Sequence, residues 1–125
     1  MIVLAERDRA ANSRRAHSRV RPKPGEPIEV QLIGPDFIEV LEVRDISAGG
    51  LGLQVPHQFE GSNIASQVDV IIKLPRQRPF SARGVIRHVS GGSMFGLEFT
   101  ELPDVARARI EAYVAARIAQ GAGSI

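Results

Sequence analysis

Apolar and polar residues alternate over most of the chain between residues 28 and 99. A period of two places successive side chains on opposite faces of a strand, so each alternating run predicts a strand with one buried face. Segments rich in Gly and Pro, such as residues 34–36 and 75–79, separate neighbouring runs and predict tight turns. The predicted strands cover residues 28–32, 37–43, 51–55, 68–74, 80–89 and 95–99.

Residues 103–121 follow a different period. Ile110, Val114 and Ile118 recur at four-residue spacing, which is typical of one face of an amphipathic helix. A proline near the start of this segment and a glycine just past its end are common helix boundaries. Six strands without intervening helices predict an antiparallel sheet that closes into a small barrel. We therefore expect an all-β barrel with a C-terminal helix whose apolar face packs on the barrel, with a partner surface as the alternative.

The length of 125 residues is that of a single domain. The net charge of +2 hides an asymmetry between its two parts. Residues 1–25 carry seven Lys and Arg against two acidic residues, a net of 7 − 2 = +5, and the remainder carries 9 − 12 = −3. We expect a flexible basic arm at residues 1–25, a barrel at 26–102 and the helix at 103–121.

Composition narrows the class of protein. Apolar residues make up 43% and charged residues 24%, as in globular domains. The absence of cysteine excludes disulfides, thiolate zinc sites and cysteine nucleophiles. No apolar run approaches the roughly 20 residues that span a bilayer, and the first residues lack the pattern of a signal peptide. We expect a cytoplasmic protein without membrane insertion.

Motifs of catalytic or metal sites are missing. The three histidines, His17, His57 and His88, have no companion at a metal-ligand spacing. No serine stands in a G-x-S-x-G or S-x-x-K pattern, and no glycine-rich segment continues into a Walker loop. We expect neither an enzyme nor a metal site or cofactor.

The first polar group that could bind a ligand is a basic cluster in the arm. Arg14, Arg15 and Arg19 lie within six residues of one another. A guanidinium pairs bidentately with phosphate and with the O6 and N7 atoms of guanine, and its flat face stacks on bases. The alternative is a solvated charge run with no ligand.

The second polar group lies between two predicted strands. Asp45 could accept hydrogen bonds from the N1–H and N2–H edge of a guanine, while Ser47 and an adjacent amide reach a polar ligand atom. The alternative is a plain turn, in which Asp45 and Ser47 satisfy turn amides and Gly49 and Gly50 supply positive φ.

Together the two clusters resemble the signature motifs of the PilZ family of cyclic di-GMP receptors. The family motif RxxxR fits Arg15 to Arg19, preceded by Arg14, and its motif (D/N)xSxxG fits residues 45–50. Residues 83–87 and 95–99 look like the last two strands of the family. The resemblance covers nearly the whole chain and implies a six-stranded antiparallel split β-barrel with a C-terminal helix.

The resemblance also implies a site. In it, Arg15 and Arg19 of a basic loop that folds over the ligand hold guanine and phosphate, while Asp45, Ser47 and Gly50 line the barrel face beneath. Gly49 belongs to the same motif segment. Two neighbouring positions stay open. Arg14 would either grip a second ligand molecule or only raise the local potential, and Arg87 and His88 would either reach the site or face solvent.

The function implied by the resemblance is that of a receptor or adaptor. It would bind cyclic di-GMP, change conformation and signal to a separate, unidentified effector protein, as a monomer or weak homodimer. One alternative is a PilZ-like interaction subunit of pilus or flagellar machinery that binds no nucleotide. A third is a small barrel for RNA or single-stranded DNA, although such proteins stack bases on exposed aromatics and aromatic residues make up 5% of this chain.

Overall fold

The computed structural model describes residues 17–54, 66–90 and 94–123. All six strands in these ranges belong to one closed antiparallel sheet, in the order β1-β2-β3-β6-β5-β4, and β4 pairs back with β1. The expected six-stranded antiparallel barrel with a C-terminal helix is therefore confirmed. The elements are β1 (Glu29–Ile33), β2 (Ile38–Ser47), β3 (Gly50–Gln54), β4 (Gln67–Lys73), β5 (Phe80–Ser90), β6 (Met94–Glu101) and α2 (Asp104–Ala119).

The core fills the inside of the barrel with the apolar residues of the alternating runs. Phe95 is buried, and Phe37, Phe80 and Phe99 are partly buried and pack against the core. Aliphatic side chains from every strand complete the core. Their polar neighbours along each strand point to the outer face of the barrel. The sequence period therefore decides which side of each strand faces the core.

Strand β2 is longer than its sequence pattern predicts. The alternation ends at Val43, but the strand continues to Ser47, with a register shift in its pairing with β3 between Val43 and Asp45. Such a bulge inserts an extra residue, so the next inward side chain after Val43 is Ile46. The motif residues Asp45 and Ser47 consequently belong to the strand, and their side chains lie on the side opposite to the inward Ile46. The turn between β2 and β3 is limited to residues 48 and 49.

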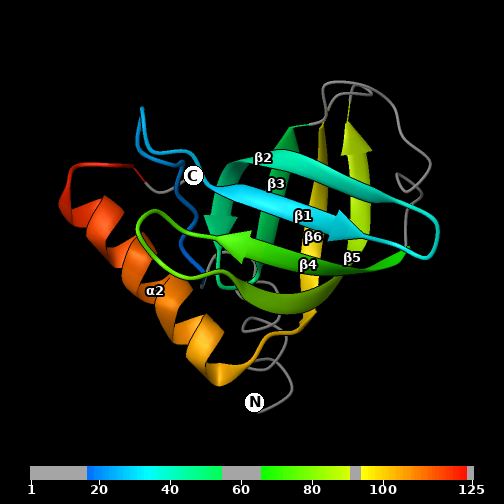
Figure 1. Ribbon diagram of the computed structural model, residues 1–125. Helices are drawn as coiled ribbons and strands as arrows, with labels where there is room; N and C mark the ends of the chain where they lie inside the picture. The colour runs from blue at the N-terminus through cyan, green and yellow to red at the C-terminus, as the bar shows by residue number, and fades with distance from the viewer. Residues whose placement is uncertain (1–16, 55–65, 91–93, 124–125) are drawn as a thin grey trace, which may run out of the picture.

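Helix α2 lies beside one end of the barrel (Figure 1). Its Ala106, Ile110 and Val114 are buried, and Tyr113 packs against the core at its edge. Ile118, the last residue of the predicted apolar face, stays 41% exposed. The helix therefore covers the barrel with its first three turns.

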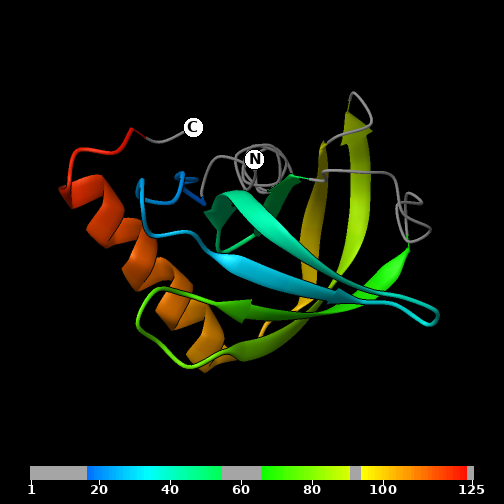
Figure 2. The same ribbon diagram turned by 45° about the horizontal axis from the view of Figure 1, so that its top comes forward.

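The described part of the expected arm lies between β2 and α2 (Figure 2). Val20 is fully buried and exchanges two backbone hydrogen bonds with Ile46, of 3.1 and 2.9 Å. The guanidinium of Arg117 in α2 donates to the carbonyl oxygen of Arg21 at 3.1 Å. Residues 17–25 are thus attached to both the barrel and the helix, and residues 1–16 lie outside the described residues.

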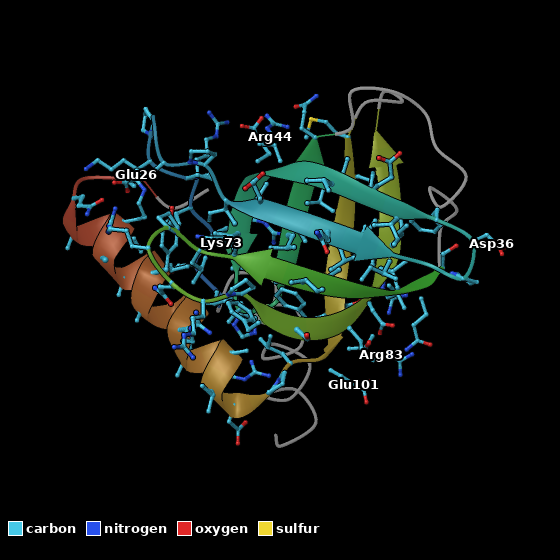
Figure 3. All side chains as sticks on the ribbon, viewed as in Figure 1. Glu26, Asp36, Arg44, Lys73, Arg83 and Glu101 are labelled. Carbon is cyan, nitrogen blue, oxygen red and sulfur yellow. The ribbon has the colours of Figure 1, made fainter. Side chains whose placement is uncertain are left out.

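Glu26 attaches the end of this segment to the turn between β4 and β5. Its carboxylate accepts a hydrogen bond of 2.7 Å from Arg76, which holds the pKa of Glu26 below its ordinary value. Figure 3 shows Glu26 near the C-terminal end of α2. A carboxyl whose pKa is lowered by folding adds stability above its ordinary pKa, and that contribution is lost as the pH falls through the folded-state pKa.

We expect Arg76→Ala to raise the pKa of Glu26 toward the ordinary value of a glutamate, because it removes the hydrogen bond and the nearest positive charge. A carbon-detected NMR titration of the Glu26 carboxyl in both proteins measures this change. Equal midpoints in the two proteins would contradict the role given to Arg76.

Candidate functional site

A pocket of about 930 Å³ opens on the outside of the barrel. The segment before Val20, the turn between β2 and β3, strand β6 and the start of α2 enclose it. Its volume lies at the upper end of the roughly 300–1,000 Å³ usual for small-molecule sites. Its lining includes His17, Arg19, Ser47, Gly49, Gly50, Arg87, Gly96, Glu98 and Arg107.

The floor of the pocket is short of side chains. On the outer face, Asp45 of β2 pairs with Gly52 of β3, and Gly52 pairs with Gly96 of β6. Gly50 pairs with Glu98 in the neighbouring outward row. Glycine in a strand lets another group approach the backbone closely. Besides Asp45 and Glu98, the outer face of these strands therefore carries few side chains here.

Arg19 and Asp45, from the two motif segments, form an ion pair. The bridge between Val20 and Ile46 explains the contact. Val20 points into the core, so its neighbour Arg19 points to the outer face, where the carboxylate of Asp45 lies. The side chains are 32% and 16% exposed, so both are partly withdrawn from water. Residues 26 positions apart are thus brought into direct contact.

Ser47 is almost fully buried, with 1% of its surface exposed. Its hydroxyl oxygen accepts a hydrogen bond of 3.0 Å from the amide of Gly49, and the carbonyl of Gly49 accepts one of 3.0 Å from the amide of Phe99. Ser47 therefore satisfies a turn amide, as in the plain-turn alternative. It also lines the pocket, and its hydroxyl hydrogen remains available as a donor.

The two glycines of β3 have different neighbours. A Cβ on Gly50 would stand 2.1 Å from the carbonyl oxygen of Leu97 in β6, so the close approach of the two strands requires glycine there. A Cβ on Gly52 would stand 2.6 Å from a carboxylate oxygen of Asp45. Gly52 thus provides the room that the Asp45 carboxylate occupies. It was not among the expected site residues, since its role depends on a partner in another strand.

Further polar side chains reach the pocket from other elements. The ring of His17 lies against Gly49, with Cδ2 at 3.1 Å from the place where a Cβ would stand. Arg87 of β5 forms an ion pair with Glu98 of β6, and Arg107 extends from the first turn of α2. Arg87 is exposed and also lines the pocket, so the two alternatives given for it do not exclude each other. Arg107 was not singled out, because nothing in a helical pattern tells which barrel strand it faces.

Several expected residues are beyond the described part of the chain. Arg14 and Arg15 precede residue 17, and the side chain of His88 is likewise outside it. Among the residues that the structure does describe, no three His, Asp or Glu side chains gather as metal ligands would. In the same residues, no helix has the length and apolar character needed to cross a membrane.

Comparisons with known proteins agree with this geometry. No curated protein matches the chain. Among solved structures, the PilZ domain of YcgR from Escherichia coli with c-di-GMP has a TM-score of 0.69 at 10% identity, over 86% of this chain and 94% of that one. The MrkH–c-di-GMP complex of K. pneumoniae has a TM-score of 0.70 at 14% identity, over 84% and 52%.

The Bacillus subtilis inhibitor of motility, MotI/DgrA, has a TM-score of 0.66 at 19% identity, over 83% of this chain and 51% of that chain. The present chain therefore spans about half the length of MrkH and of MotI. At these identities the structures show a shared fold. The family model described as the PilZ domain matches residues 13–116, which is most of the sequence. The chain therefore belongs to the PilZ domain family.

Proposed function

We propose that this chain is a receptor for cyclic di-GMP that takes its ligand in the pocket between the arm, β6 and α2. One observation carries the proposal. Arg19 and Asp45, from two motifs far apart in the sequence, meet beside a pocket that Ser47, Gly50 and Gly96 also line. Relatives solved with c-di-GMP, YcgR and MrkH, share the fold. Among the described residues of the pocket, the Ser47 hydroxyl is hydrogen-bonded to the amide of Gly49 and not to a base, which fits a binding module better than an enzyme.

The ligand would replace the contact between Arg19 and Asp45. Cyclic di-GMP carries two phosphate anions and two guanines. A phosphate beside Asp45 would meet a like charge, whereas the N1–H and N2–H edge of a guanine offers that carboxylate two donors. Arg19, released from the carboxylate, can pair with phosphate or with the O6 and N7 atoms of guanine. The two members of the ion pair therefore match opposite parts of the ligand.

The remaining motif residues would shape the surface under the ligand. The hydroxyl of Ser47 can donate a hydrogen bond while its oxygen keeps accepting from Gly49. Gly96 and Gly50 line the pocket where a purine would lie. Arg14 and Arg15, which precede the described residues, would add guanidiniums from the same arm.

Calorimetric titration with cyclic di-GMP tests the proposal, and the informative variant is Arg19→Ala. We expect the wild type to bind with a dissociation constant in the micromolar range or below, and Arg19→Ala to bind about fivefold or more weakly, since a bidentate arginine contact is worth roughly 1–3 kcal/mol. Arg78→Ala, which removes an equal charge from the exposed turn between β4 and β5, is the control.

The outcomes separate the competing functions. No binding heat from the wild type at high ligand concentration would favour a PilZ-like interaction subunit that binds no nucleotide. Salt-sensitive binding to a single-stranded RNA oligomer, without preference for the cyclic dinucleotide, would favour the third alternative. Equal affinity in wild type and Arg19→Ala would show that the pocket beside Asp45 is not the site.

The signal would pass to a separate effector protein. Residues 17–21 contact both β2 and α2, so a ligand that draws Arg19 away from Asp45 acts on a segment that the helix also holds. Among the relatives, MotI is described as an inhibitor of motility and MrkH as a transcription regulatory factor. Their outputs differ, so the effector of this chain is to be identified by experiment.

A further inference from the structure

The pocket has a second cationic side, away from the contact between Arg19 and Asp45. Strands β3 and β6 separate β2 from β5 in the barrel. At 4.7–4.9 Å for each strand spacing, β2 and β5 lie about 14 Å apart along the sheet. Asp45 of β2 and Arg87 of β5 therefore start from strands that lie on opposite sides of β3 and β6.

Arg107 is a further cation of the same pocket. It extends from the first turn of α2 and is partly buried in the pocket wall. Four and eleven residues further along the helix, Glu111 and Ile118 line a smaller pocket of about 260 Å³, which shares His17 with the first. Residues at this spacing lie on one face of a helix. One face of α2 therefore lines both pockets, and Arg107 is its residue in the larger pocket.

The charge of Arg107 is not compensated within the described part of the chain. Its side chain makes no hydrogen bond or ion pair with any residue there. Two residues on, the guanidinium of Arg109 donates to Gln77 at 2.9 Å and stacks 4.7 Å from the centre of the Phe80 ring. Arg117, later in the helix, is bound to the carbonyl of Arg21.

The other arginines of the pocket have anionic partners. Arg19 is paired with Asp45, and Arg87 with Glu98. Outside the pocket, Arg83 is similarly held by Asp69 and Glu101, and Figure 3 shows Arg83 near Glu101. Among the described arginines that line this pocket, Arg107 is therefore the one without an ion pair.

We propose that Arg107 forms a second anion-binding subsite, in the pocket that Arg87 also lines, and that this subsite holds one phosphate group of the bound cyclic dinucleotide. The proposal rests on the function proposed above. The two phosphates of a cyclic dinucleotide lie on opposite sides of its macrocycle. Arg19 can meet one of them, and Arg107 the other. Arg87 can bind a phosphate only after its ion pair with Glu98 is broken. Arg107 has no ion pair to break, so its charge is available to the ligand without rearrangement.

Calorimetry with cyclic di-GMP on Arg107→Ala and Arg107→Gln tests the subsite, with Arg78→Ala as the charge-matched control outside the pocket. We expect both Arg107 variants to bind about fivefold or more weakly than the control, as for loss of one charge-assisted pair. Thermal unfolding of each variant identifies any loss of fold. The glutamine variant keeps the length of the side chain if the alanine variant is unstable.

Phosphorus NMR of the bound ligand gives a second, local readout. The two phosphates of free cyclic di-GMP are equivalent by symmetry, and we expect two signals in the complex because each meets a different cation. Arg107→Gln should shift one signal and Arg19→Ala the other. If the Arg107 variants bind cyclic di-GMP as tightly as Arg78→Ala and neither phosphorus signal moves, the subsite is overturned while the receptor function is retained. Absence of binding by the wild type would overturn both.

Discussion

Gly50→Ala is expected to lower the stability of the barrel by about 3 kcal/mol and its melting temperature by about 10 °C or more. The added Cβ would stand 2.1 Å from the carbonyl oxygen of Leu97 and 3.2 Å from the Cα of Glu98. Both neighbours are backbone atoms of β6, which cannot rotate away as a side chain does. The two strands must separate at this point, and the hydrogen bonds of the β3–β6 ladder weaken with them.

Urea unfolding and thermal melts of Gly50→Ala measure this effect, and Gly123→Ala is the matched control. Gly123 has no heavy atom within 4 Å of an added Cβ and no positive φ, so the same chemical change should be almost neutral there. Equal stabilities of the two variants would show that the β3–β6 approach tolerates a methyl group. A large loss would assign Gly50, expected as a ligand-lining residue, a structural role as well.

Gly52→Ala is expected to weaken cyclic di-GMP binding by about 5- to 150-fold while the barrel stays folded, which corresponds to roughly 1–3 kcal/mol for one lost bidentate contact. An added Cβ would stand 2.6 and 2.8 Å from the two carboxylate oxygens of Asp45. The carboxylate is the end of a side chain and can turn aside, so the strand pairing survives. Its displacement removes both the acceptor for guanine and the partner that orients Arg19.

A double-mutant cycle shows whether Gly52 acts through Asp45. If the carboxylate is the only link, the variant Gly52→Ala/Asp45→Ala binds as weakly as Asp45→Ala alone, because residues in direct contact are not additive. Additive losses of affinity would instead mean that Gly52 contributes to the site independently. Near-wild-type binding by Gly52→Ala would overturn its role as a positioning residue.

The period of the sequence was enough to predict the strands and the helix, because burial of one face imposes alternation locally. The prediction was wrong at the end of the second strand, which continues from Val43 to Ser47. A bulge changes the spacing of inward residues from two to three there, and a search for strict alternation ends at Val43. Beyond the bulge, β2 continues because its residues pair with β3 as far as Ser47 and Gly50, and the sequence does not show this pairing.

The motif segments could be found in the sequence, but their contacts could not. Arg19 was expected to hold a ligand, and in the structure it is paired with Asp45. That contact depends on the bridge between Val20 and Ile46, 26 residues apart. Arg107 is a similar case, since its place at the pocket depends on how α2 packs on the barrel.

By itself, the sequence determined the number and approximate limits of the strands, the helix, the separation of charge between residues 1–25 and the rest, and the two motifs that mark the PilZ family. These are local properties, readable from period, composition and spacing. The tertiary structure decided which strands are neighbours, that Gly52 makes room for the Asp45 carboxylate, and that Arg107 faces the same pocket as Arg19. Each of these depends on packing between segments distant in the chain, which a local pattern does not encode.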